Sequence, residues 1–138
     1  MIKELKMSQL SLLFNQALNA RQNAYAPYSH FAVGAAVLSA NGKIYAGCNV
    51  ENISYPCGTC AEAGAIAAMN ADGGRLIKDI VVVADGDSLI SPCGACLQRI
   101  FEFADAETTV HLADLTGIKQ SLKITELLPI SFDEGSLK

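Results

Sequence analysis

The chain of 138 residues is 51% hydrophobic and 17% charged, a composition that supplies an ample apolar core for one domain spanning residues 1–138. Its net charge of −4 and its scattered Lys and Arg residues argue against a nucleic-acid partner. The sequence contains no apolar run of about 18 residues, so we expect no membrane partner. The charged segment 1–7 is unlike a secretory signal, which favours a cytoplasmic protein. In a reducing compartment, the five cysteines indicate metal binding or catalysis rather than disulfides.

The first half of the chain predicts a helix followed by a strand hairpin. Apolar residues recur at helical spacing over residues 8–20, with Ser8 as the expected N-cap. Residues 31–38 and 43–48 have the composition of two antiparallel strands, and Asn41-Gly42 between them is a strong hairpin signal. Polar side chains follow directly after the second strand, a position that often holds ligands.

The second half alternates helices and strands. Thr59 is the expected N-cap of an alanine-rich helix that ends at the glycine pair after Asp72. Residues 77–84 predict a buried strand in parallel pairing, and a second helix that bears cysteines begins near Pro92. Residues 108–113 and 119–124 predict two more strands, and residues 125–128 predict a helical turn. The tail after them is expected to be irregular. This order predicts an α/β fold, a three-layer α/β/α sandwich around a mixed five-stranded sheet.

Two segments that bear cysteines open these predicted helices: Cys60-Ala61-Glu62 and Pro92-Cys93-Gly94-Ala95-Cys96. Three thiolates leave one tetrahedral position of Zn²⁺ for a water, and a nearby carboxylate that is not a ligand can carry protons. Helix N-termini favour thiolate over thiol. A Cys-x-Glu step followed by Pro-Cys-x-x-Cys is the pattern of zinc nucleobase deaminases. The residues therefore predict hydrolytic chemistry at zinc held by Cys60, Cys93 and Cys96, with Glu62 as proton carrier.

Other interpretations of the cysteines stay open. Cys57 extends the first step, so the chain also contains the paired CxxC pattern of a structural four-cysteine zinc site. Cys57 could equally close a catalytic site as a further ligand. A redox disulfide pair would explain one CxxC step only. Glu62, three residues after the expected N-cap, could instead complete a capping box. Both histidines are expected to be structural, because His111 lies inside an apolar strand and His30 in a loop without a metal-spaced partner.

Over about residues 8–132, the chain resembles the homotetrameric cytidine deaminases with an all-cysteine zinc site. Six segments carry the resemblance: 26–29, 31–35, 47–52, 60–62, 91–96 and 126–129. The resemblance implies hydrolytic deamination of cytidine and 2′-deoxycytidine to the corresponding uridines, with release of ammonia, in pyrimidine salvage. It also implies one Zn²⁺ per subunit, which activates the water that adds to C4 while Glu62 shuttles protons.

The same resemblance implies roles for residues around the metal. Asn49 and Glu51 match the pair that hydrogen-bonds the ribose 3′-hydroxyl, and Phe31 matches the aromatic residue that faces the pyrimidine. The backbone of Ala61 would bind the base carbonyl, and the carbonyl of Ser91 would accept from the 4-amino group. Neighbouring subunits of a homotetramer would contribute three further residues: Ile53, Tyr55 and Phe132.

One departure from the family pattern concerns charge. Many relatives carry Arg directly after the Cys-Ala-Glu step, where it hydrogen-bonds the thiolates, but this chain has Ala63 there. Three thiolates give zinc a net negative environment, which makes a bound water less acidic. We expect the helix N-termini, with Arg99 or Arg75, to compensate. Two alternative functions stay open: deamination of a related aminopyrimidine nucleoside such as blasticidin S, and a zinc-stabilised module without catalysis.

Overall fold

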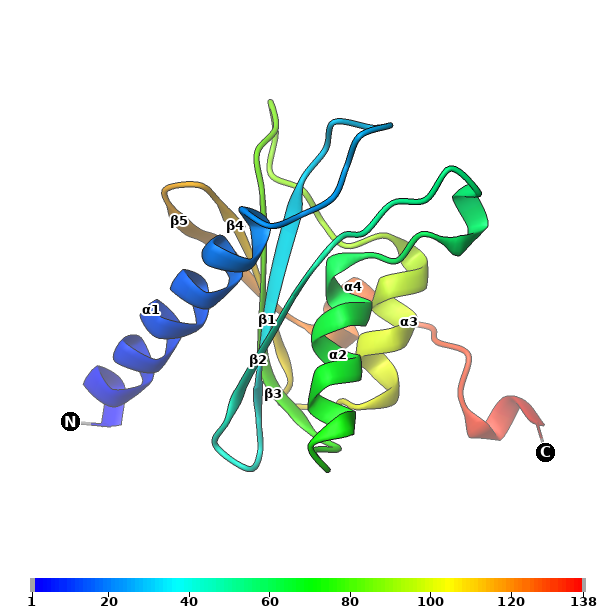
Figure 1. The fold of residues 1–138 in the computed structure, drawn as a ribbon. Helices are drawn as coiled ribbons and strands as arrows, with labels where there is room; N and C mark the ends of the chain where they lie inside the picture. Colours follow the sequence, from blue (N-terminus) through cyan, green and yellow to red (C-terminus); the bar gives the residue numbers. More distant parts are fainter. Residues whose placement is uncertain (1, 138) are drawn as a thin grey trace.

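A mixed five-stranded sheet lies at the centre of the fold, with helices on both faces (Figure 1). The computed structural model describes residues 2–137, and side chains from residue 6 onward. The strands lie in the order β2-β1-β3-β4-β5. Their bounds are β1 Val33–Ser39, β2 Ile44–Cys48, β3 Ile77–Ala84, β4 Thr109–Asp114 and β5 Gly117–Lys123. β3 and β4 pair in parallel, and the other neighbouring pairs are antiparallel.

The helices form the two outer layers. One face of the sheet is covered by α1, Ile2–Arg21, and the other by α2, Ala61–Ala71, with α3, Gly94–Glu102, and α4, Ile124–Leu127, beside it (Figure 1). Short 3₁₀ turns occur at η1, Tyr55–Cys57, and η2, Glu134–Leu137. The predicted three-layer α/β/α sandwich is confirmed. Among the described helices, none is both long and apolar enough to cross a membrane.

Alternating residues of the strands divide the core into two apolar layers. Val82 on β3 packs with the cluster that includes Met69 of α2, whereas its neighbour Val81 packs with Leu13 of α1. Successive side chains of a strand point to opposite faces, so a strand covered on both faces must be apolar throughout. The predicted buried strand over residues 77–84 is confirmed, together with its parallel pairing to β4.

Glycines allow the helices to approach the sheet closely. A Cβ at Gly34 on β1 would lie 2.0 Å from the carbonyl oxygen of Ala17 on α1. A Cβ at Gly47 on β2 would lie 2.5 Å from the backbone nitrogen of Ala65 on α2. Because these distances are too short for a side chain, the two glycines set the spacing of both helix layers, including the helix that bears Glu62.

Several predicted boundaries are wrong, two of them at helix starts. α1 is already helical at Ile2, because the residues before Ser8 include good helix formers and continue the helix without a cap. The N-cap of α2 is Cys60 rather than Thr59. Thr59 is held in an extended bridge to Val50, with N···O distances of 2.9 and 3.0 Å. The bounds of α3, β4, β5 and α4 differ from the predictions by one or two residues at their ends.

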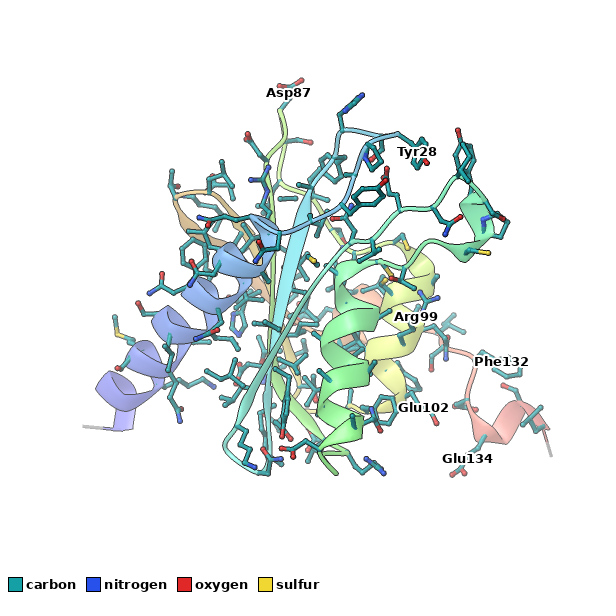
Figure 2. The ribbon with its side chains drawn as sticks, in the orientation of Figure 1. Tyr28, Asp87, Arg99, Glu102, Phe132 and Glu134 are labelled. Carbon is teal, nitrogen blue, oxygen red and sulfur yellow. The ribbon has the colours of Figure 1, made fainter. Side chains whose placement is uncertain are left out.

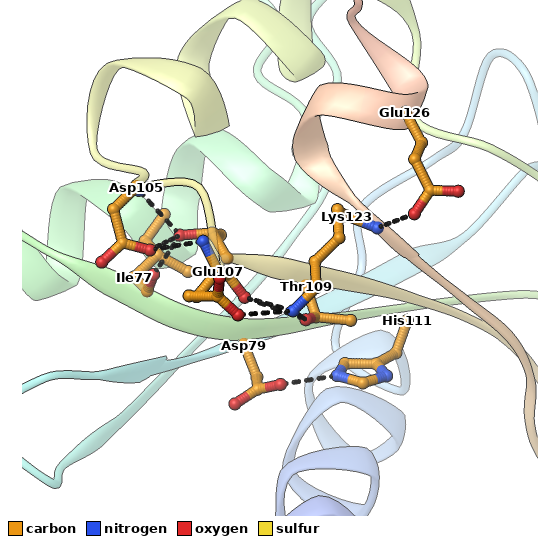
Figure 3. A network of polar contacts seen from close by, with 9 residues as sticks. Ile77, Asp79, Asp105, Glu107, Thr109, His111, Lys123 and Glu126 are labelled. Carbon is orange, nitrogen blue, oxygen red and sulfur yellow. Dashed lines mark hydrogen bonds and ion pairs between the residues drawn. The ribbon is translucent and has the colours of Figure 1, made fainter.

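His111 lies inside the sheet and joins three strands. Its Nε2 is 2.8 Å from Oδ1 of Asp79 on β3 (Figure 3), and its Nδ1 is 2.7 Å from Oγ of Ser121 on β5. His111 and Asp79 are both buried. These contacts satisfy the polar groups that the sheet buries, so His111 is structural, as predicted.

Candidate metal centre and active site

Two helix starts meet beside a buried carboxylate. Cys60 is the N-cap of α2, Cys93 is the N-cap of α3, and Cys96 lies in the first turn of α3. The ligand atoms of Cys60, Glu62 and Cys96 all lie within 4.8 Å of one another. Two sulfurs and a carboxylate at this spacing form a donor set that suits Zn²⁺. The predicted placement of the cysteines at helix N-termini is confirmed.

The two remaining candidate ligands lie outside this cluster. Cys93 is exposed at its N-cap position, and it lines the same cavity as the cluster. Cys57 is exposed in η1, where its sulfur lies 3.5 Å from Oγ of Ser54. Within residues 2–137, Cys57 belongs neither to the cluster nor to the cavity wall. The structure therefore gives the four-cysteine interpretation no support.

A cavity of about 300 Å³ opens over the cluster. Its wall includes five further residues predicted from the sequence: Phe31, Asn49, Ala61, Ser91 and Cys93. It also includes Pro92 of the cysteine-bearing segment and three residues to which the sequence assigned no role at the site: Val33, Val82 and Ile90. Val33 and Val82 look like ordinary core residues in the sequence. Only the pairing of β1 with β3 brings these strand ends to the site.

The other predicted substrate contacts lie away from this cavity. Glu51 and Tyr55 line a second cavity of about 370 Å³ with Tyr28 and Ser29. Ile53 and Phe132 are exposed, and Figure 2 shows Phe132 on the C-terminal tail. The prediction that neighbouring subunits contribute Ile53, Tyr55 and Phe132 stays a prediction.

The paired thiols of Cys60 and Cys96 differ in acidity. The Cys96 thiol donates a hydrogen bond to the Cys60 sulfur, which lowers the pKa of Cys60 to about 6. The same bond, with burial, raises the pKa of Cys96. The backbone N–H of Ala63, in the first turn of α2, and the charge of Arg99 also lower the pKa of Cys60. The helix start thus stabilises a thiolate, as predicted.

Arg99 supplies a positive charge directly beside the sulfurs (Figure 2). Its Nη1 lies 3.5 Å from Sγ of Cys60 and 3.6 Å from Sγ of Cys96. The Cys60 thiolate in turn raises the pKa of Arg99. Arg75 instead donates to the carbonyls of Asn70 and Gly74. The expectation that an arginine approaches the thiolates is confirmed for Arg99 and is wrong for Arg75.

Glu62 lines the cavity and is buried, with 4% of its surface exposed. Burial raises the pKa of its carboxyl, and the nearby Cys60 thiolate adds to the effect. No side-chain hydrogen bond caps α2, and Glu62 is the second residue of the helix rather than the third. The capping-box interpretation of Glu62 is therefore wrong. A carboxyl group with a raised pKa is suited to taking up and releasing protons near neutral pH.

The fold and the cluster together define a class. A three-layer sandwich that joins a Cys-x-Glu helix start to a Cys-x-x-Cys helix start is typical of zinc-dependent deaminases. A family model described as the cytidine and deoxycytidylate deaminase zinc-binding region matches residues 7–112. The chain belongs to this family of zinc-binding enzymes.

Individual relatives agree with this assignment. The chain is 43% identical over 125 residues to the cytidine deaminase of Sporosarcina psychrophila, covering 91% of this chain and 92% of the relative. It is 40% identical over 134 residues to a probable cytidine deaminase of Dictyostelium discoideum, covering 96% and 90%. The crystal structure of the cytidine deaminase from Burkholderia pseudomallei superposes with a TM-score of 0.83 at 40% identity, covering 88% of this chain and 98% of that chain.

Proposed function

We propose that the protein is a zinc-dependent cytidine deaminase that hydrolyses cytidine and 2′-deoxycytidine to the corresponding uridines and ammonia. One observation carries this proposal: a buried carboxyl group, Glu62, lies within 4.8 Å of the paired sulfurs of Cys60 and Cys96. The family assignment supports the same reaction. We place the reaction in the salvage of pyrimidine nucleosides in the cytoplasm.

Cys60, Cys93 and Cys96 would hold the zinc ion. Once bound, zinc supplies a Lewis acid that makes a water acidic enough to act as a nucleophile at neutral pH. Cys93 is the N-cap of α3 and lines the cavity over the cluster, which favours it over Cys57 as the third ligand. Arg99 offsets the negative charge of the thiolates.

Glu62 moves the protons. Its carboxylate takes a proton from the attacking water and delivers it to N3 of the pyrimidine. It then takes the remaining proton of the new C4 hydroxyl and delivers it to the amine, so that ammonia leaves as the C4–N bond breaks and the C4 carbonyl forms. Its raised pKa fits a group that must both accept and donate within one cycle. Its burial keeps bulk water from exchanging these protons.

The cavity wall orients the nucleoside. Phe31 would face the base, the Ala61 backbone would bind the base carbonyl, and the Ser91 carbonyl would accept from the 4-amino group. Asn49 and Glu51 would bind the ribose 3′-hydroxyl. Both side chains already hydrogen-bond within the chain, but an amide and a carboxylate each offer about four hydrogen-bonding positions, so each retains capacity for a hydroxyl.

The exposed apolar residues favour assembly into a homotetramer. Ile53 and Tyr55 are each 74% exposed, on the segment that projects from the body of the fold beyond β2 (Figure 1), and Phe132 is 62% exposed. Side chains of this kind gain about 1.5–3 kcal/mol each when they are buried in a contact. The tail that carries Phe132 is anchored by Gln98, whose Nε2 donates to the Phe132 carbonyl at 2.6 Å. These residues would complete the active sites of neighbouring subunits.

A nucleoside panel tests the proposal. Cytidine, 2′-deoxycytidine, free cytosine and blasticidin S are each incubated with the protein, with and without a zinc chelator, while ultraviolet absorbance is followed. We expect loss of absorbance with both cytidine nucleosides and its abolition by the chelator. Turnover of blasticidin S alone would favour the related antibiotic deaminase, and no turnover of any compound by zinc-loaded protein would favour a non-catalytic module. A single-stranded oligonucleotide in the panel checks the expected lack of action on nucleic acid.

A further inference from the structure

The loop between α1 and β1 is clamped by a carboxylate that follows β2. Glu51 Oε1 accepts from the backbone N–H groups of Tyr28, at 3.0 Å, and Ser29, at 3.1 Å. Glu51 Oε2 accepts from the hydroxyl of Ser29. These bonds lower the pKa of Glu51, and the bond from the Ser29 hydroxyl has the largest effect. Three hydrogen bonds to one charged group join the loop to the strand end that carries Asn49.

The Ser29 hydroxyl makes a second contact, with the backbone of Phe31. Its Oγ accepts from the backbone N–H of Phe31 at 3.1 Å. The Phe31 carbonyl accepts from Nδ2 of Asn49 at 2.8 Å, and Oδ1 of Asn49 accepts from the Val33 N–H at 2.9 Å. A continuous chain of hydrogen bonds therefore runs from Glu51 through Ser29 to the backbone of Phe31.

The backbone between these hydrogen bonds adopts an uncommon conformation. His30, between Ser29 and Phe31, has φ +58°, in the left-handed region that residues with a Cβ seldom occupy. Its N–H donates to the Ala26 carbonyl at 3.0 Å. The hydrogen bonds on both sides of His30 hold this conformation, so removing one of them allows the Phe31 backbone to relax.

We infer that Ser29 is a positioning residue that couples the carboxylate of Glu51 to the backbone of Phe31. Ser29 is not among the residues that line the cavity over the cysteine cluster, and in the second cavity its hydroxyl is already bonded to both Glu51 and the Phe31 N–H, so it acts through these two partners. The inference rests on the proposed function for the ligand that this loop positions, a nucleoside with Glu51 near its sugar and Phe31 near its base. A contact between the sugar and Glu51 thereby orders the loop backbone at Phe31.

The first test compares four proteins: wild type, Ser29→Ala, Ser29→Thr and the matched control Ser11→Ala, an exposed serine on α1. Ser29→Ala is expected to raise the KM for cytidine about tenfold, as for loss of one hydrogen bond to a charged group, with kcat and zinc content nearly unchanged. Ser29→Thr keeps the hydroxyl and should restore the KM. A similar KM in wild type and Ser29→Ala would overturn the inference.

A second test measures the coupling itself. Glu51→Gln is combined with Ser29→Ala, and the effects on kcat/KM should be less than multiplicative because both changes break the same hydrogen-bond chain. Hydrogen exchange over residues 28–33 should accelerate in Ser29→Ala but not in Ser11→Ala. Multiplicative effects, or unchanged exchange, would refute the coupling. If wild type fails to consume cytidine, the proposed function fails, while the exchange measurement still tests the role of Ser29.

Discussion

Arg99 on α3 donates from Nη1 to the sulfur of Cys60, 3.5 Å away at the start of α2. The same nitrogen lies 3.6 Å from the sulfur of Cys96, on its own helix. The guanidinium therefore bridges the two helix starts. The residue after the Cys-Ala-Glu step is Ala63, so α3 supplies the positive charge that α2 lacks.

Replacing Arg99 should reduce the acidity of the water activated at this site. In Arg99→Ala, the thiolates lose a positive neighbour, so the pKa of the water rises and the acid limb of the pH–rate profile moves to higher pH. We expect kcat at neutral pH to fall about tenfold, equivalent to about 1.4 kcal/mol. The kcat of Arg99→Lys, which keeps a positive charge, should lie between those of the wild type and Arg99→Ala. An unshifted pH profile in Arg99→Ala, at full zinc content, would contradict this role.

Replacing Glu62 should stop proton transfer without releasing the metal. Glu62→Gln is expected to lower kcat by about 10²–10⁴, the usual contribution of a general acid–base group. Zinc content measured by atomic emission should stay at the wild-type value, because the carboxyl is not assigned as a ligand. Glu102→Gln, at an exposed position on α3, serves as the control. Loss of zinc from Glu62→Gln would instead make the carboxylate a ligand.

Cys93 and Cys57 are both exposed thiols, but only Cys93 lines the cavity over the cluster. We expect Cys93→Ala to lose zinc and activity, because the remaining two sulfurs leave the tetrahedral site short of a ligand. Cys57→Ala should keep both. The measurement is metal stoichiometry after dialysis against a weak chelator. Zinc loss from Cys57→Ala would instead support the four-cysteine interpretation.

Gly34 sets the distance between α1 and the sheet, so a side chain there should destabilise the fold. A Cβ would lie 2.0 Å from the backbone oxygen of Ala17 and 2.7 Å from the backbone nitrogen of Arg21. Gly34→Ala should lower the free energy of unfolding by about 3 kcal/mol, the upper range for an overpacked core. Gly64→Ala is the control, since its closest contact of 3.5 Å is ordinary. Melting followed by circular dichroism compares the two variants, and equal melting temperatures would contradict the argument.

Local residue patterns were enough to predict the elements and the chemistry of the cluster. Helical and strand periodicities depend on neighbours a few residues apart, so α2, β3 and the two cysteine-bearing helix starts could be predicted without a structure. The Cys-x-Glu and Cys-x-x-Cys steps indicate their chemistry directly, because thiolates bind zinc and a carboxylate beside them can transfer protons. The N-caps were less certain, because Thr59 is drawn into a bridge to Val50 that lies outside its local sequence.

Tertiary structure alone decided the relationships between distant segments. Cys60 and Arg99 are 39 residues apart, and Ser29 and Glu51 are 22 residues apart. Arg99 follows Cys96 by three residues on one helix, a spacing at which side chains meet, so that contact is local. Its contact with Cys60 depends on the packing of α3 against α2. Likewise, the contact between Glu51 and Ser29 depends on the antiparallel pairing of β1 with β2. That pairing brings residues 28–33 beside the end of β2. Such contacts depend on how whole elements pack, and local periodicity carries no information about that packing.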